Sequence, residues 1–230
     1  MQEETSDNVS VELLSFNNLS LEGYPLVLDN YQRAYVWGVD KVIQLLNDLL
    51  SFIQESEDED AYYMGTLLLH KKIGEKQKVL CVIDGQQRLT SLAVLYWLLN
   101  KQLPTHIQFS FRSSRSMVNV QQAKQTIQHW LAENNLEIDK LVGVFDRLRF
   151  TVIIVTREDL AFTFFDTQNN RGVPLGSTDL LKSFHLRAIH SDDAQIDELL
   201  QSHCASRWEK VQVQGELGKN SSNHDFAPEL

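Results

Sequence analysis

The chain has 230 residues, a formal net charge of −10, and 43% hydrophobic and 23% charged residues, a composition typical of soluble globular proteins. This length suits one large domain, or one domain with a small helical extension. The acidic balance argues against a protein that binds DNA over its whole surface. No apolar run approaches the roughly 18 residues of a membrane helix, and the polar N-terminus does not resemble a signal peptide. A cytoplasmic location is therefore expected.

Charge and cysteines are unevenly distributed along the chain. The window from Gly85 to Ala132 contains no Asp or Glu but several Lys, Arg and His residues, so one face could be locally positive. Chance clustering on a solvated surface explains this window equally well. Cys81 and Cys204 lack metal or redox spacing and are expected to be reduced and unpaired.

In the first half of the chain, hydrophobic period and turn residues predict strands that lead into helices. A weak edge strand over residues 9–14 is followed by a helix that Asp40 caps and that runs to about Gln54. Two strands, 66–70 and 79–83, then form a hairpin around Gly74. The second strand leads directly into Asp84-Gly85, and a helix with one apolar stripe follows over 86–99.

The second half is predicted to be mostly helical. A strand is expected over 107–111 and a buried, β-branched strand over 149–155, with helices over 120–133, 138–148, 159–168, 179–189 and 193–211. The fold class is therefore α+β, with a mixed strand and helix domain over 1–115, a mainly helical extension over 116–214 and a polar tail over 215–230.

The junction at Asp84-Gly85 is the strongest local feature. Gly85 permits a turn with positive φ, and the next residues occupy a first helical turn, whose N–H groups lack partners and whose dipole end is positive. Arg88 precedes the apolar stripe, so its guanidinium is expected to face solvent or a phosphate ligand. From geometry alone, a plain turn with Asp84 as N-cap is the better interpretation. The alternative is an anion site in which Asp84 holds a metal.

Two further segments carry residues that suit a binding site. A helix is predicted to end at Asn169 and Arg171 before Pro174, and the next helix carries Asp179 and Lys182 near its start. A capped helix–turn–helix explains this segment, except that it gives no reason for the donor-rich side chains of Asn169 and Arg171 to lie so close together. In the aromatic segment 31–37, core packing is favoured over base stacking.

Four motifs in order resemble one family. They are Tyr-Gln-Arg-x-Tyr-x-Trp at 31–37, Tyr-Tyr-x-Gly-Thr at 62–66, Ile-Asp-Gly-Gln-Gln-Arg-Leu-Thr at 83–90, and Phe-x-x-x-Asn-x-Arg-Gly-x-x-Leu-x-x-x-Asp-Leu-Leu-Lys at 165–182. The chain thus resembles the domain of unknown function 262, the N-terminal part of GmrSD-type restriction endonucleases, which is similar to ParB nucleotide-binding domains. Ala34 stands where the family often has Pro.

The resemblance implies that a nucleoside triphosphate is bound and hydrolysed around Asp-Gly-Gln-Gln-Arg, with Mg²⁺ as the expected cofactor. The implied catalytic residues are Asp84, which would also hold the metal, Gln87 and Arg88. The implied nucleotide-binding residues are Arg33, Gly85, Gln86, Asn169, Arg171, Asp179 and Lys182. A shared anion would bring the segment 169–182 back to the Asp84 turn. The sequence has no Gly-x-x-x-x-Gly-Lys-Ser/Thr loop, so a P-loop enzyme is excluded.

The resemblance also implies a role in restriction of phage with modified DNA. Such proteins usually continue into a His-Asn-His nuclease module, which this sequence does not show, so a fragment, a short paralogue or one subunit of a split system is expected. Contact with modified DNA would then pass through a partner or a missing C-terminal module, and a homo-oligomer is left open. One alternative is a non-catalytic module that senses nucleotide or modified DNA. Another is a weak nicking nuclease, against which the net acidity argues.

Overall fold

The computed structural model describes residues 8–29, 32–57, 59–73, 78–111, 113–134, 138–157, 159–161, 163, 185–186, 188–189, 196, 199–201, 203–208 and 210. The chain divides into two compact units, Met1–Asp29 with Ala34–Gly172, and Asn30–Arg33 with Val173–Leu230. Among the described residues of the second unit, 203–208 are helical, and the rings of His185 and Trp208 meet edge to face at 5.3 Å. In the described residues, no helix is long and apolar enough to cross a membrane.

The first unit is built on a mixed sheet of five strands in the order β1-β5-β3-β4-β2. The strands are β1 (Val9–Ser15), β2 (Leu26–Val27), β3 (Tyr62–Ile73), β4 (Lys78–Asp84) and β5 (Leu148–Val155). The pairs β1–β5 and β3–β4 are antiparallel, and the pairs β3–β5 and β2–β4 are parallel. The sheet and its helices confirm the predicted α+β class.

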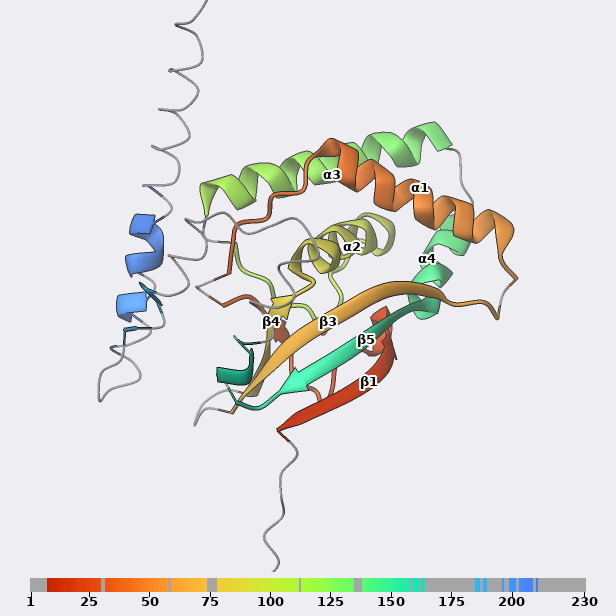
Figure 1. Ribbon diagram of the computed structural model, residues 1–230. Coiled ribbons are helices and arrows are strands. Elements are labelled where there is room, and N and C mark those ends of the chain that lie inside the picture. Colours follow the sequence, from red (N-terminus) through yellow and green to blue (C-terminus); the bar gives the residue numbers. More distant parts are fainter. Residues whose placement is uncertain are drawn as a thin grey trace, which may run out of the picture. The chain divides into compact units, whose positions relative to one another are not determined.

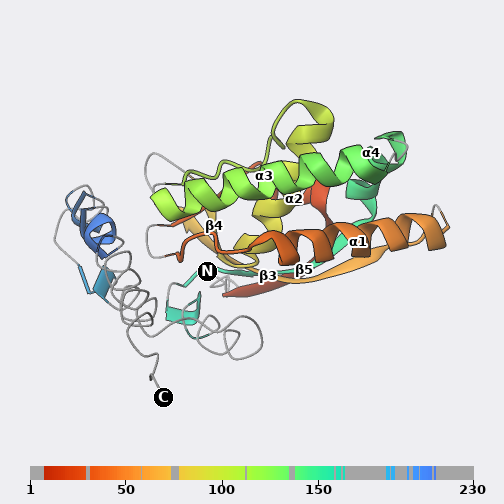
Figure 2. The same ribbon diagram turned by 90° about the horizontal axis from the view of Figure 1, so that it is seen from above.

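The helices cover one face of this sheet in two layers, as Figure 1 shows. They are α1 (Val39–Glu55), α2 (Gln86–Asn100), α3 (Ser114–Asn134) and α4 (Ile138–Arg147), with a short 3-10 turn at Phe16–Asn18. Helix α2 lies between the sheet and the pair α1 and α3, which run side by side across it (Figures 1 and 2). As a result α2 is buried on several sides, including Leu89, Leu92, Leu95 and Leu98, rather than along one stripe.

Two expectations about local structure differ from what is observed. Gly38, not Asp40, is the N-cap of α1, and Asp40 lies in the first turn without a capping bond. Residues 107–111 form no strand, because Ile107 makes only an isolated bridge with Leu26. Strand β5 pairs with both β1 and β3, so residues on both sides of position 115 share one sheet and one compact unit.

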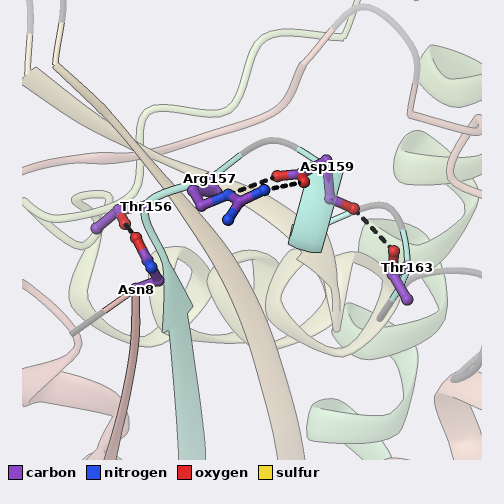
Figure 3. Close-up of polar contacts among 5 residues, drawn as sticks. All are labelled: Asn8, Thr156, Arg157, Asp159 and Thr163. Atoms are coloured by element: carbon purple, nitrogen blue, oxygen red, sulfur yellow. Dashed lines mark hydrogen bonds and ion pairs between the residues drawn. The ribbon is translucent and has the colours of Figure 1, made fainter.

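Figure 3 shows the polar contacts where the chain leaves β5. The dashed line between Thr156 and Asn8 joins their side chains, where Oγ1 donates to Oδ1 at 3.4 Å. Their backbones also bond, because the Thr156 N–H donates to the Asn8 carbonyl at 3.1 Å, which extends the β1–β5 ladder by one residue. Arg157 then pairs with Asp159 through Nε and Oδ1 at 3.1 Å, and Thr163 Oγ1 donates to the Asp159 carbonyl at 2.9 Å. Exposed pairs of this kind contribute little stability. They mark where β5 gives way to helical residues.

Candidate functional site

The β4–α2 junction turns at Gly85, which has φ 98° and ψ 0°. A Cβ at this position would lie 2.2 Å from Cδ2 of Leu67, so both the backbone conformation and the neighbouring side chain require glycine. Gly85 is also the N-cap of α2, and no side chain caps the helix, so the interpretation of Asp84 as N-cap is wrong. The first helical bond runs from the Leu89 N–H to the Gly85 carbonyl at 3.0 Å. The N–H groups of residues 86–88 therefore have no acceptor within the helix.

The Arg88 guanidinium is bonded to the backbone of β3. Nη1 donates to the Met64 carbonyl and Nη2 to the Thr66 carbonyl at 2.6 Å, while Nη2 lies 3.8 Å from Oδ2 of Asp84. The side chain is 23% exposed, so the expectation of a guanidinium that faces solvent or ligand does not fit this structure. Burial lowers the pKa of Arg88 and the charge of Asp84 opposes this, but an arginine remains protonated.

These bonds explain the motif Tyr-Tyr-x-Gly-Thr at 62–66. The pairing register of β3 with β5 shifts between Tyr63 and Thr66, which marks a β-bulge, and Gly65 in this bulge has φ 94°. A Cβ on Gly65 would lie 2.4 Å from Nη1 of Arg88. Arg88 thus satisfies two carbonyl groups that flank Gly65, and the glycine leaves room for its guanidinium.

Gln87 is buried, at 5% exposure, and bonds to an irregular segment before α1. Its Oε1 accepts from the N–H groups of Val36 at 2.8 Å and Trp37 at 3.2 Å, and its Nε2 donates to the Ala34 carbonyl at 3.1 Å. The same segment inserts the fully buried Tyr35, as the core-packing interpretation predicts. The amide of Gln87 therefore joins the first turn of α2 to residues 34–37.

Two consecutive hydrogen bonds hold the hydroxyl group of Tyr35 in the core. Its OH lies 2.8 Å from Oγ of Ser91, which donates to the Gln87 carbonyl at 2.9 Å. Because the serine has one hydroxyl proton, the tyrosine is the donor to Ser91. Burial raises the pKa of Tyr35 to about 12, with the bond to Ser91 opposing the shift. Its ring packs in the core, so it does not stack on a base.

Two buried polar atoms on α2 have no protein partner. They are Oε1 of Gln86 and Oγ1 of Thr90, in residues that are 5% and 2% exposed. Residues four apart share one face of a helix, so both belong to the side of α2 that begins at its open N-terminus. Buried polar groups are normally hydrogen-bonded, and these two have free capacity for a ligand or a water. The neighbouring Asp84 carboxylate has a side chain that is 42% exposed.

The remaining candidates belong to the second compact unit or lie outside the described residues. Arg33 is half-buried and belongs to the second compact unit. Asn169, Arg171, Asp179 and Lys182 lie outside the described residues, and so does the predicted return of this segment to the Asp84 turn.

Asp84 is the residue expected to hold a metal ion. No cluster of three or more His, Cys, Asp or Glu side chains suited to a metal ion occurs in the part of the chain that the structure describes. A Mg²⁺ ion that enters with a phosphate group needs only one or two carboxylates and completes its shell with phosphate oxygens and water. The half-exposed Asp84 beside three open N–H groups fits such an ion.

Sequence reasoning missed the residues that hold this site together. Gly65 accommodates Arg88, and Ser91 links α2 to Tyr35. The glycine within an otherwise strand-like motif was a signal of a bulge or of close backbone approach. The spacing of Ser91 four residues after Gln87 gave no comparable signal.

A family model described as the N-terminal domain of the GmrSD restriction endonuclease matches residues 12–186. A search of curated proteins found no match.

Proposed function

The chain belongs to the family of GmrSD restriction endonuclease N-terminal domains, and from this premise we propose that it binds and hydrolyses a nucleoside triphosphate at the β4–α2 junction. One observation carries the proposal. Three N–H groups of the first turn of α2 lack helical acceptors beside the half-exposed Asp84 and the unpartnered Oε1 of Gln86. A helix N-terminus with open N–H groups favours phosphate.

Each residue at the junction has a proposed role. The N–H groups of residues 86–88 would bind phosphate oxygens, and Gly85 allows the phosphate to approach the backbone. Asp84 would hold Mg²⁺, which supplies charge neutralisation of the phosphates, or would orient the attacking water. Arg88 of α2, whose guanidinium is bonded to the backbone of β3, would supply fixed positive charge. We retain Arg33, Asn169, Arg171, Asp179 and Lys182 as further proposed nucleotide ligands.

A second candidate function is a module that binds nucleotide or modified DNA without hydrolysis and signals to a nuclease. The contacts of Arg88 favour it, because the guanidinium already bonds to two carbonyl groups of β3 and is less available to a transition state. In either case we propose that DNA is cut by a partner or by a further C-terminal module.

Phosphate release and calorimetry test both candidates. The purified chain is incubated with ATP or GTP, with and without Mg²⁺ and with and without DNA, alongside Asp84→Asn. Hydrolysis that requires Mg²⁺ and is lost in Asp84→Asn supports the enzyme. Binding without phosphate release supports the sensing module. The absence of both binding and hydrolysis contradicts the proposed nucleotide site.

A further inference from the structure

The segment Ala34–Trp37 has no regular secondary structure, yet side chains of two helices bond to its backbone. Besides the three bonds from Gln87, the Tyr35 N–H donates to Oγ of Ser116 at 3.0 Å, and Nδ2 of Asn119 donates to the Tyr35 carbonyl at 2.7 Å. Buried backbone groups outside helices and strands need such partners. The clamp, defined as Gln87, Ser116 and Asn119, therefore fixes this segment to α2 and α3.

The amide of Gln87 has little capacity left for a substrate. Its Oε1 already accepts two bonds, one for each lone pair, and its Nε2 donates to Ala34. The side chain is 5% exposed and its own carbonyl accepts from Ser91. The oxygen therefore cannot also accept a bond from an attacking water, and the second N–H of Nε2 is the one group left to contact it, in a side chain that is almost fully buried.

We propose that the side chain of Gln87 has a positioning role rather than a catalytic one: through the clamp it holds the segment Ala34–Trp37 on α2, and its amide does not touch the reacting phosphate. The bond from Gln87 to the Ala34 carbonyl fixes the first residue of this segment against the first turn of α2, where the phosphate would bind. The role in nucleotide binding rests on the proposed function, whereas the clamp itself does not.

Hydrogen exchange tests the clamp in the absence of nucleotide. Gln87→Met keeps the approximate shape of the side chain and removes both functions of the amide. The amides of Val36 and Trp37 are expected to exchange about fivefold faster or more, the change that corresponds to the loss of one net hydrogen bond. Gln121→Ala, at an exposed position of α3, is the matched control and leaves these amides unchanged. Unchanged exchange of Val36 and Trp37 in a folded Gln87→Met chain overturns the proposal.

Steady-state kinetics with Mg²⁺ and ATP or GTP distinguish positioning from catalysis. Gln87→Met is expected to raise KM about tenfold with kcat within about twofold, since only ligand placement is lost. Asn119→Ala acts on the same segment from α3, far from the β4–α2 junction in sequence, and is expected to reproduce this pattern. A loss of kcat at unchanged KM in Gln87→Met, with Asn119→Ala like the parent chain, overturns the proposal.

The exchange and kinetic experiments together distinguish a failure of the proposed function from a failure of the clamp. If the parent chain neither binds nor hydrolyses ATP or GTP, the proposed function fails. The hydrogen-exchange experiment alone then still decides whether the clamp exists. If Gln87→Met does not fold, Asn119→Ala carries the same test, read at the amides of residues 35–37.

Discussion

The guanidinium of Arg88 occupies the space that a side chain at Gly65 would need, since Nη1 of Arg88 lies 2.4 Å from the position of a Cβ built on Gly65. The two residues come from a helix and a strand, and the guanidinium bonds to the carbonyl groups on both sides of the glycine. The β-bulge and the arginine therefore depend on each other. This dependence makes the junction sensitive to changes at either position.

Gly65→Ala is expected to destabilise the fold by at least about 2 kcal/mol, because alanine is strained at φ 94° and its Cβ would displace Arg88. Gly143→Ala is the matched control. No atom lies within 4 Å of a Cβ at this position within α4, so alanine is expected to stabilise by about 0.5 to 1 kcal/mol. Urea unfolding measures both changes, and equal midpoints for Gly65→Ala and the parent chain would contradict the first.

Arg88→Ala is expected to lower both stability and nucleotide turnover. A guanidinium that faced solvent or ligand, as the sequence suggested, could be removed without harm to the fold, but in the structure the mutation would leave the Met64 and Thr66 carbonyl groups unpaired. Bonds to a charged donor contribute about 1.5 to 3 kcal/mol, so a destabilisation of that size is expected. Turnover is therefore compared well below the midpoint of thermal unfolding. A variant as stable as the parent chain would show that the bonds to β3 contribute nothing.

Much of the fold could be predicted from local sequence. The hydrophobic period predicted α1, α2 and α3, and the two apolar runs on either side of Gly74 predicted the β3–β4 pair, because these patterns reflect neighbours close in sequence. The site was only partly predictable. Gly85 follows from turn geometry, but the partners of Gln87 and Arg88 lie 51 and 22 residues away at Val36 and Thr66. Polar side chains that bond to distant backbone groups look like ligand-binding residues when only the sequence is known.

His106 is expected to make the fold less stable in acid. It is 6% exposed, and burial lowers the pKa of its imidazole from 6.5 to about 4. The unfolded chain takes up this proton near pH 6.5, whereas the folded chain does so only near pH 4. Stability is therefore lost as pH falls between these values, by up to about 3 kcal/mol.

Comparison with His106→Phe isolates this contribution, because the acidic residues titrate in both proteins. The ring packs edge to face on Phe16 and its Nε2 has no hydrogen-bond partner, so an apolar ring is a suitable replacement. The difference in unfolding free energy between the parent chain and the variant is expected to change from pH 7 to pH 4.5. His129→Gln, at a side chain that is 76% exposed, is the control. A pH-independent difference for His106→Phe would contradict the prediction.

The described cations of the acid-free window are largely engaged within the protein. Lys101 donates to the Leu98 carbonyl at 2.7 Å, Lys124 lies 4.7 Å from the ring centre of Trp97, and Arg88 is bonded to β3. Few of these charges can neutralise phosphates without breaking an internal contact. The predicted positive face is therefore weaker than a count of basic residues suggests, and the net charge of −10 opposes a polyanion at long range.

The chain alone is accordingly expected to bind duplex DNA weakly and to leave it uncut. Dissociation constants of about 10⁻⁴ M or weaker are expected near physiological salt, with a shallow dependence on salt because few counterions are released. Fluorescence anisotropy with plain and phage-modified duplexes measures both quantities. The salt concentration is varied between about 50 and 200 mM, the range in which counterion release is visible. Lys101→Ala is expected to leave the affinity unchanged, since its ammonium is already bonded to Leu98. Cleavage is assayed with Mg²⁺ and nucleotide. Cleavage that disappears in Asp84→Ala would assign the nuclease activity to this domain. It would contradict the proposal that a partner or a further C-terminal module cuts the DNA.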